Sequence, residues 1–369
     1  MRAWPAPAPC IRNRRSPGST DRSCPRRRRC HSSGRIPSRS HPLVPVLVYA
    51  TKTWAVKRST RDRFPPRRIR HDTRYSDRAR PTPRRARTHS PGGPMQTRTV
   101  RSSTGRDIAV TVEGSGPGVI VVHGSIVSAA DYRVLARELG RRCTVYRYDR
   151  TGRGDAPEFD LAADRADLAA ITEATGVGNV LAHSYGGFVA LEAARTLPLD
   201  RLAIFDPAMP VSGLFPTDFL EAMDEALRRG DTAGALARMS VGLDLAGPLA
   251  RMPFAAQRFA ARVFLRTPPG RPFADRLPAM VAEGRAALPH RDPARYTSVT
   301  ANTLLIAGGA SPYYFRAVCD ALRAAIPAAS CLDLPGLRHH APNAGAAALV
   351  AAVGEWVARD PDCARDTAC

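Results

Sequence analysis

The sequence predicts an α/β fold in which a mostly parallel central sheet is flanked by helices on both faces and carries a helical cap insertion. Three observations support this prediction. From Met95 onward, short apolar runs alternate with longer segments of helical periodicity. Several of the short runs are continuously apolar, which is typical of strands that are buried on both faces. Between about residues 207 and 300 the alternation stops, and helical patterns follow one another without a strand.

The expected elements follow in chain order. The first strand, at 107–114, alternates like an edge strand, and the second, at 118–124, is a β-branched run. Further strands are expected at 143–149, 179–184, 201–207, 302–309 and 330–336, with helices at 129–140, 160–176, 185–198, 313–327 and 344–360. Four more helices, at 217–230, 231–243, 253–266 and 273–288, form the cap. In such a sheet, functional groups gather at the carboxyl ends of the strands.

The first 94 residues differ from the rest of the chain in composition. They carry 25 Lys and Arg against 4 Asp and Glu, whereas residues 95–369 carry 30 against 29 and contain no lysine. The same arm holds 14 of the 33 prolines and almost no periodic apolar pattern, so we expect it to be disordered. We assign residues 95–360 to one domain with a cap at about 207–300, and residues 361–369 to a tail.

Three hypotheses account for the basic arm. Its positive charge could bind nucleic acid or an anionic surface, but no aromatic interleaving, zinc-ligand spacing or recognition helix accompanies the charge. It could be a targeting segment with a short apolar stretch at Pro42–Ala50, although the 41 residues ahead of that stretch are too many for an ordinary signal peptide. We favour an upstream extension without a folded role, with Met95 as the working start.

The cysteine spacing and the short apolar runs argue against a disulfide-rich, zinc-binding or membrane-spanning protein. Three of the eight cysteines lie in the arm and five in the body, without a CxxC pair or a histidine at metal-ligand spacing. This pattern argues against a disulfide framework and a zinc site, and it favours a cytoplasmic protein. No apolar run approaches the roughly 20 residues that a membrane-spanning helix needs. The sequence leaves the oligomeric state open.

The segment "NVLAHSYGGF" runs from a predicted strand into a predicted helix across Ser184. A serine at such a hinge is presented on a tight turn, and the flanking residues must be small because side chains there would strike the neighbouring strand and helix. Ala182 and Gly186 meet this requirement in an A-x-S-x-G pattern, and Gly187 lets the helix approach the sheet. Because small residues also flank serines by chance in Ala-rich sequences, the hypothesis of a nucleophile needs partner residues.

A serine nucleophile needs a base, and the base needs an orienting acid. The segment "LPGLRHHAP", after the last predicted strand, offers His339 and, as its competitor, His340. We favour His339 because of its spacing behind Pro335 and Gly336; a solvated loop histidine is the alternative.

Backbone N–H groups near the nucleophile should stabilise an oxyanion. In "VIVVHGSI", a strand ends at His123 and Gly124, and the N–H of Ser125 could point inward. The N–H of Tyr185 opens the helix after Ser184, where the helix dipole favours an anion. We expect His123 itself to be a structural hydrogen-bonding residue.

Together, "HGS", "YDRTGRGD", "AHSYGG", "PGLRHH" and the helical cap make residues 95 to about 360 resemble the α/β-hydrolase fold superfamily, in particular its small bacterial serine hydrolases. The resemblance implies a nucleophile at Ser184, a base at His339 and an oxyanion hole at Ser125 and Tyr185. It also implies a structural role for one loop, which contains Asp149, Arg150, Gly152 and Gly154.

The triad acid departs from the commonest pattern of that family. Many members place an aspartate beyond the glycine of the strand matching 302–309, but here no carboxylate follows until Asp320, which is expected deep in the next helix. Other relatives place the acid after the strand that follows the nucleophile helix, where this chain has Asp206. We therefore assign Asp206, which preserves the chain order Ser, Asp, His. A helix cap for the lid is the alternative role of Asp206, and Asp333 is a further candidate for the acid.

Serine rather than aspartate at position 184 favours acyl transfer over epoxide hydrolysis or dehalogenation. The leading hypothesis is a carboxylic ester hydrolase that cleaves a small ester, thioester or lactone through an acyl enzyme, with no metal or organic cofactor. Alternatives are a lyase or cofactor-independent oxygenase that uses the same site, or a ligand-binding protein without activity. The expected partner is a small-molecule acyl substrate. Six apolar residues of the cap are available to line its pocket, although most should be packing residues: Phe215, Phe219, Met223, Phe254, Phe259 and Phe264.

Overall fold

The structure, a computed structural model, describes residues 95–154 and 158–359. The predictions for the basic arm and for the tail at 361–369 lie outside the described residues. Within the described ranges, no helix is long and apolar enough to cross a membrane.

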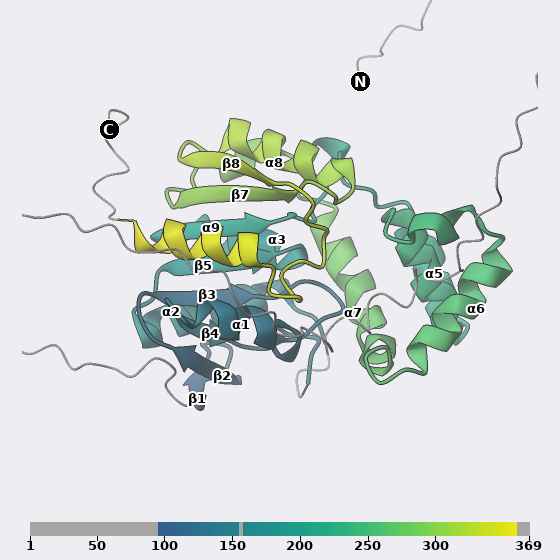
Figure 1. Cartoon of the computed structure of the whole chain (residues 1–369), viewed down its shortest axis with the longest axis horizontal. Helices are drawn as coiled ribbons and strands as arrows, with labels where there is room; N and C mark the ends of the chain where they lie inside the picture. The colour runs from purple at the N-terminus through teal and green to yellow at the C-terminus, as the bar shows by residue number, and fades with distance from the viewer. Residues whose placement is uncertain (1–94, 155–157, 360–369) are drawn as a thin grey trace, which may run out of the picture. The chain divides into compact units, whose positions relative to one another are not determined.

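One eight-stranded sheet forms the centre of the fold, with the strand order β1-β2-β4-β3-β5-β6-β7-β8 (Figure 1). The pairs β1–β2 and β2–β4 are antiparallel, and all other pairs are parallel. The prediction of a mostly parallel sheet is therefore confirmed. The strands are β1 (Gln96–Arg101), β2 (Asp107–Gly114), β3 (Gly118–Val122), β4 (Thr144–Arg147), β5 (Asn179–His183), β6 (Arg201–Phe205), β7 (Asn302–Gly308) and β8 (Ala329–Leu334).

The sequence pattern misses β1 and wrongly predicts β2 as the edge strand. β1 pairs with β2 from Gln96 opposite Val112 to Arg101 opposite Asp107, so β1 is the edge. Nearly all β1 side chains are exposed, and no apolar period marks this strand in the sequence. The alternation in β2 arises because Ile108 and Val110 face the core while their neighbours Asp107 and Ala109 face solvent.

Helices cover both faces of the sheet. α1 (Arg133–Leu139) and α9 (Ala347–Ala358) pack on one face and lie in front of the sheet in Figure 1. α2 (Leu161–Thr175), α3 (Tyr185–Ala194) and α8 (Tyr313–Ala325) pack on the other face. Short 3₁₀ turns lie at Ala129–Tyr132, Val211–Gly213, Gly247–Arg251 and Pro293–Tyr296.

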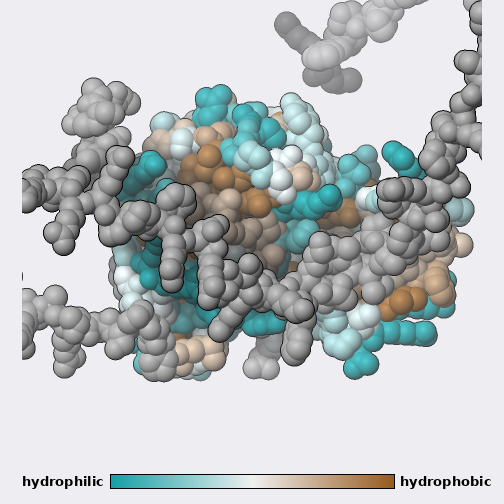
Figure 2. Space-filling model, viewed as in Figure 1, coloured by the Kyte–Doolittle hydropathy of each residue, from teal (hydrophilic) through white to brown (hydrophobic). Residues whose placement is uncertain are grey.

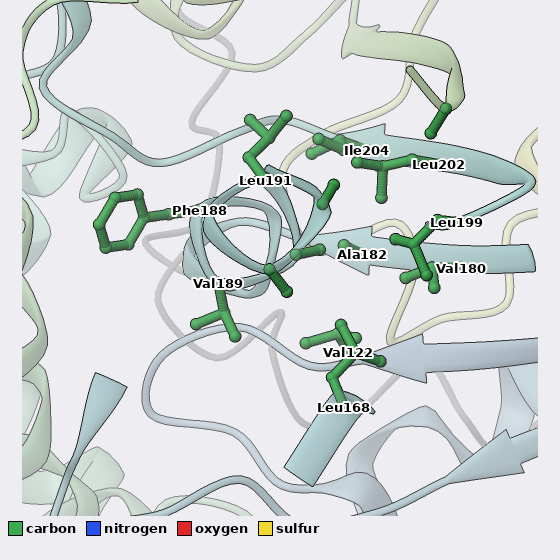
Figure 3. Close-up of a cluster of buried hydrophobic side chains, with 14 of the residues drawn as sticks. Val122, Leu168, Val180, Ala182, Phe188, Val189, Leu191, Leu199, Leu202 and Ile204 are labelled. Atoms are coloured by element: carbon green, nitrogen blue, oxygen red, sulfur yellow. The ribbon is translucent and has the colours of Figure 1, made fainter. Parts of the chain in front are cut away.

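Successive residues of β3 enter opposite halves of the core. Val119 and Val121 pack with α1 and α9, whereas Ile120 and Val122 pack with α2 and α3. Figure 3 shows the second half, in which Val122 lies near Leu168 of α2 below Val189 of α3. Burial on both faces explains why this strand is continuously apolar in sequence.

Between β6 and β7 the chain forms four α-helices and no strand, and we call this segment, residues 207–300, the cap. Its helices are α4 (Phe219–Arg228), α5 (Thr232–Gly242), α6 (Phe254–Leu265) and α7 (Arg271–Ala287). They share a core of their own that includes Met223, Leu236 and Leu277. Figure 1 shows α7 beside the sheet, with α5 and α6 farther out.

The outer surface of the cap is partly apolar. In Figure 2, hydrophobic (brown) surface lies on the cap beside hydrophilic residues. Four exposed large apolar side chains lie on α6 or just before it: Met252, Phe254, Phe259 and Val263.

Candidate active site

Ser184 lies at the junction of β5 and α3 in a strained backbone conformation, with φ of 56° and ψ of −126°. Its N–H donates to the Phe205 carbonyl at 3.0 Å, and its carbonyl accepts the N–H groups of Gly187 at 2.9 Å and Ala208 at 3.2 Å. These hydrogen bonds to β6, to α3 and to the start of the cap hold the turn. Such a turn presents the side chain at the carboxyl edge of the sheet.

The small residues around Ser184 are required by close backbone approaches. A Cβ atom on Gly186 would lie 2.5 Å from the carbonyl oxygens of Val122 and His123, and one on Gly187 would lie 2.4 Å from Ile204 Cγ2. A Cβ atom on Gly124 would lie 3.0 Å from the Cβ atom of Ser184. Ala182, on the other side of the turn, is fully buried. Larger side chains would therefore push α3 or the loop after β3 away from the serine.

The structure brings Ser184, Asp206 and His339 together at the carboxyl edge of the sheet, after β5, β6 and β8 respectively. His339 Nε2 lies 3.2 Å from Ser184 Oγ, and His339 Nδ1 lies 3.1 Å from Asp206 Oδ2. Both distances are within hydrogen-bonding range, so one imidazole ring bridges the hydroxyl and the carboxylate. His340 also lines the cavity beside Ser184, and its pKa is lowered by burial and by its neighbour His339.

Asp206 is fully buried and is held by the last residue of β7 and the loop that follows it. Its Oδ1 accepts the Gly308 N–H at 2.8 Å, and its Oδ2 accepts the Ser311 hydroxyl at 2.6 Å. This loop is the one that lacks a carboxylate in the sequence, and it supplies hydrogen-bond donors instead. Asp333, the further candidate for the acid, pairs with Arg316, and so does Asp320 of α8.

Two aromatic rings pack against His339. Phe315 of α8 stacks on its ring with centroids 4.4 Å apart and an angle of 10° between the planes. The ring of His183 lies 4.7 Å away. Burial, followed by the neighbouring charge of His339, holds the pKa of His183 well below its usual value. Because His183 is neutral, it does not repel a positive charge on the neighbouring ring of His339.

Tyr132 links His183 to the loop after β3. The Gly124 N–H donates to the Tyr132 hydroxyl at 3.2 Å, and this hydroxyl lies 2.5 Å from His183 Nδ1. Because the Gly124 N–H is occupied, the next amide along the loop, that of Ser125, is the one available for a ligand. Sequence reasoning did not identify Tyr132 or His183, since only the folded chain brings them together.

The backbone N–H groups of Ser125 and Tyr185 have no hydrogen-bond acceptor among the described residues. Both residues line the same cavity as Ser184 and His339. The Tyr185 amide is the first of α3, where the unpaired N–H groups of a helix favour negative charge. The two amides are therefore suited to an anion that forms next to Ser184.

His123 and Arg150 hold the loop that carries Ser125. The Arg150 N–H donates to His123 Nε2 at 3.0 Å, and His123 Nδ1 lies 2.8 Å from the Gly124 carbonyl. The Arg150 side chain donates to the carbonyls of His123 at 3.0 Å and Gly124 at 3.2 Å. Burial and the positive charges of Arg150 and Arg153 hold the pKa of His123 well below its usual value. His123 is thus a neutral hydrogen-bonding residue.

Arg150 also joins the core to the cap through buried ion pairs. Its guanidinium lies 2.7 Å from Asp164 of α2 and 2.6 Å from Glu283 of α7, and all three side chains are fully buried. Arg153 lies 3.1 Å from Glu283 and balances the second negative charge. Burial alone would raise the pKa of Glu283, but Arg150 and Arg153 outweigh it and lower the pKa.

A cavity of about 230 Å³ adjoins Ser184 between the core and the cap. Its walls include Ser125, Ser184 and His339 of the core, and side chains from all four cap helices. Of the six cap residues singled out in the sequence, Phe215, Phe219 and Phe264 line the cavity. Met223 is buried in the cap core, and Phe254 and Phe259 are exposed. Among the described residues, no cluster of His, Cys, Asp and Glu could hold a metal ion.

The model of the alpha/beta hydrolase family matches residues 119–353, more than half of the chain. The protein therefore belongs to the alpha/beta hydrolase family, as the sequence motifs predicted. The match contains Ser184, Asp206 and His339 and all of the cap.

Solved structures of several hydrolases are similar to this chain. An alpha/beta hydrolase from Sphaerobacter thermophilus is 30% identical, with 69% of this chain and 99% of that chain covered and a TM-score of 0.55. A hydrolase from Pseudomonas aeruginosa is 20% identical, with 71% and 98% covered and a TM-score of 0.54. A thermophilic esterase from Thermogutta terrifontis is 19% identical, with 71% and 98% covered and a TM-score of 0.51. No curated protein matches the chain.

Proposed function

We propose that the protein is a serine hydrolase that cleaves a small ester, thioester or lactone through an acyl-enzyme intermediate. The observation that carries this proposal is the hydrogen-bonded series from Ser184 Oγ through the His339 ring to the Asp206 carboxylate, at 3.2 and 3.1 Å. The series borders the cavity, so a bound carbonyl group would meet the hydroxyl. The family and its hydrolase relatives support hydrolysis as the reaction class.

The first half of the reaction forms the acyl enzyme. Ser184 Oγ attacks the substrate carbonyl carbon while His339 Nε2 accepts the hydroxyl proton. Asp206 stays ionised and accepts a hydrogen bond from His339 Nδ1–H, which orients the ring and stabilises the imidazolium. The N–H groups of Ser125 and Tyr185 donate to the oxyanion of the tetrahedral intermediate. His339 then gives the proton to the leaving alcohol or thiol as its bond to the acyl carbon breaks.

The second half releases the acid. A water molecule attacks the acyl carbon, His339 takes its proton, and the bond to Ser184 Oγ breaks as the proton returns to that oxygen. The products are a carboxylic acid and the free enzyme. Ser184 excludes the alkyl-ester chemistry of epoxide hydrolases and dehalogenases, which needs a carboxylate nucleophile at this position.

The proposal is tested by covalent labelling combined with product analysis. A fluorophosphonate should label the folded protein at Ser184, as identified by peptide mass spectrometry, and the Ser184→Ala variant should stay unlabelled. Hydrolysis of p-nitrophenyl acetate in H₂¹⁸O should place one ¹⁸O atom in the released acetate. Folded wild-type protein that remains unlabelled would contradict the proposal. Turnover without ¹⁸O in a carboxylate product would instead favour a lyase or oxygenase.

A further inference from the structure

Among the described residues, no carboxylate, ammonium or guanidinium group lines the cavity beside Ser184. About a quarter of the whole sequence is charged, yet no Asp, Glu, Lys or Arg of the described residues lines the cavity. The two other histidines in the wall, His183 and His340, have lowered pKa values because they are buried near His339. A charged group that entered the cavity would lose its hydration and find no ionic partner.

Two polar side chains of the cap that line the cavity donate hydrogen bonds to backbone carbonyls of the cap. The Ser240 hydroxyl donates to the Leu236 carbonyl at 2.8 Å. The Gln257 amide donates to the Met252 carbonyl at 2.7 Å. The rest of the cap wall is dominated by apolar side chains such as Phe219 and Phe264. This part of the cavity therefore suits a hydrocarbon group.

The cavity extends from the sheet edge to the outer part of the cap. Ser184 lines the cavity at the sheet edge, and Gln257, Ala260 and Ala261 of α6 line the same cavity. Figure 1 shows α6 on the side of the cap away from the sheet. A group bound over Ser184 could thus project toward α6.

The polar part of the cavity lies on the side of His339. His340 and Asn343 follow it in the same loop and also line the cavity. The leaving group must contact His339 Nε2 to receive a proton, so it belongs on this polar side. The acyl group then occupies the apolar part that leads into the cap.

We infer that the natural substrate is an uncharged ester or thioester whose acyl group is an apolar chain that extends from Ser184 through the cap to α6. This inference rests on the proposed serine-hydrolase function. By this inference, α6 limits the length of the acyl chain that the cavity accepts, because the end of the acyl chain lies against Ala260 and Ala261.

Wild-type full-length protein provides the first test, with p-nitrophenyl esters of constant leaving group. From acetate to longer straight-chain esters, kcat/KM should rise about three- to fourfold for each added methylene until the chain fills the cavity. An ester of equal length whose acyl chain ends in a carboxylate should be at least about 100-fold poorer, because the carboxylate would be buried without a partner. A flat length series, or equal turnover of the charged ester, would overturn the inference.

Two variants of α6 test the position of the chain end. Ala260→Phe and Ala261→Leu should shift the best substrate to a shorter chain, so that the ratio of long-ester to acetate kcat/KM falls at least about tenfold. Phe259→Ala is the matched control, because Phe259 lies on the same helix, is 68% exposed and is not part of the lining; it should keep the wild-type length profile. Wild-type profiles in both folded cavity variants would refute the assignment to α6.

Failure of this inference can be told apart from failure of the proposed function. If Ser184 is labelled and p-nitrophenyl acetate is hydrolysed but the length series is flat, only the inference fails. If neither labelling nor turnover occurs in folded protein, the proposed function fails and the inference falls with it.

Discussion

Asp206 shows how a single side chain is fixed by contacts distant in sequence. It follows β6 directly in a left-handed conformation with φ of 48°, and its own N–H donates to the Ile306 carbonyl of β7 at 2.8 Å. Its carboxylate contacts Gly308, Ser311 and His339. These contacts leave the carboxylate little freedom to turn away from the histidine.

We expect Asp206→Asn to lower kcat for p-nitrophenyl acetate by about 10⁴-fold. An amide NH₂ group in place of Oδ2 would face the Ser311 hydroxyl and His339 Nδ1, which disfavours the tautomer that accepts a proton from Ser184. Steady-state kinetics checks this, with unchanged thermal unfolding as evidence of folding. Asp320→Asn is the control, because Asp320 pairs with Arg316 on α8; it should retain wild-type turnover. A similar kcat for both variants would remove Asp206 from the mechanism.

Local sequence signals predict the tight turn at Ser184 but not the side chains that hold Asp206 and His339 in place. Ala182, Gly186 and the change from strand to helix are all visible within ten residues. Ser311 contacts Asp206, 105 residues away in the chain, because β7 lies beside β6. Phe315 stacks on His339 because α8 packs against β7 and β8. Ser311 nevertheless lies in the loop where many family members carry the acid, and this was the available signal.

At the scale of elements, α7 differs from the other cap helices because buried ion pairs join it to the core. Glu283 pairs with Arg150 at 2.6 Å and with Arg153 at 3.1 Å. Nearer its start, Arg276 pairs with Asp131 at 2.9 Å. The carbonyls bound by Arg150 belong to the loop with the Ser125 amide, so the position of α7 and the shape of the proposed oxyanion hole are linked.

We expect Glu283→Gln to lower the free energy of unfolding by about 3 kcal/mol, because it leaves two buried guanidinium groups with a single carboxylate, that of Asp164. Urea unfolding followed by circular dichroism would measure the change. Glu221→Gln is the control, since Glu221 of α4 is 77% exposed and pairs at the surface with Arg285 of α7, the helix that carries Glu283. Its effect should stay below about 0.5 kcal/mol. Equal effects of the two variants would contradict this account of α7.

Glu192, near the end of α3, joins this helix to the segment that contains Arg295 and Tyr296. This buried carboxylate accepts hydrogen bonds from the Tyr296 hydroxyl at 2.8 Å and from Arg295 at 3.0 Å. Burial alone would raise the pKa of Glu192, but the hydrogen bonds, chiefly from Arg295 and Tyr296, outweigh burial and lower the pKa to about 2. A carboxyl group with a lowered pKa stabilises the folded state above its ordinary pKa, and this contribution disappears as the pH falls through the folded value.

The Glu192→Gln variant should therefore show a pH-dependent loss of stability. At pH 7 its free energy of unfolding should be about 3 kcal/mol below that of wild type, and the difference should narrow as the pH falls from 4.5 toward 2. Urea titrations at a series of pH values would show this. Glu173→Gln, at an exposed position of α2, should not change stability at any pH. A difference for Glu192→Gln that stays constant with pH would refute the role of its charge.

Periodicity predicts most of the helices and strands because their apolar faces are buried. The expected strand at 118–124 corresponds to β3 (Gly118–Val122), and the expected helix at 217–230 to α4 (Phe219–Arg228). The order of the strands could not be predicted, because β3 pairs with both β4 and β5 through contacts that leave no local pattern. β1 could not be predicted either, since its stability comes from backbone pairing with β2 and its side chains face solvent.

At the scale of the whole molecule, the excess positive charge and the residues of the proposed site lie in different parts of the chain. The chain has a net charge of +22, whereas residues 95–369 carry 30 basic and 29 acidic side chains. All residues of the proposed site lie in the second part.

Protein that begins at Met95 should match the full chain in kcat/KM for p-nitrophenyl acetate and in unfolding temperature. It should pass through a cation-exchange column at a salt concentration that retains the full chain, because nearly all of the excess positive charge has been removed. Filter binding to duplex DNA at several salt concentrations would show whether the arm alone has affinity for nucleic acid. Lower kcat/KM of the shorter protein would show that the arm contributes to the site.

The pairing of β5 with β6 limits where this protein can gain or lose residues during evolution. His183 lies opposite Phe205, so Ser184 and Asp206 are each the next residue after the same rung of the sheet. An insertion or deletion that slips β6 by one position would turn Asp206 to the other face of the sheet, away from His339. The cap begins directly after Asp206, beyond this rung. Residues can therefore be added to or removed from the α4–α6 part of the cap without shifting the strands that carry Ser184 and Asp206, which leaves this segment open to evolutionary change in substrate range.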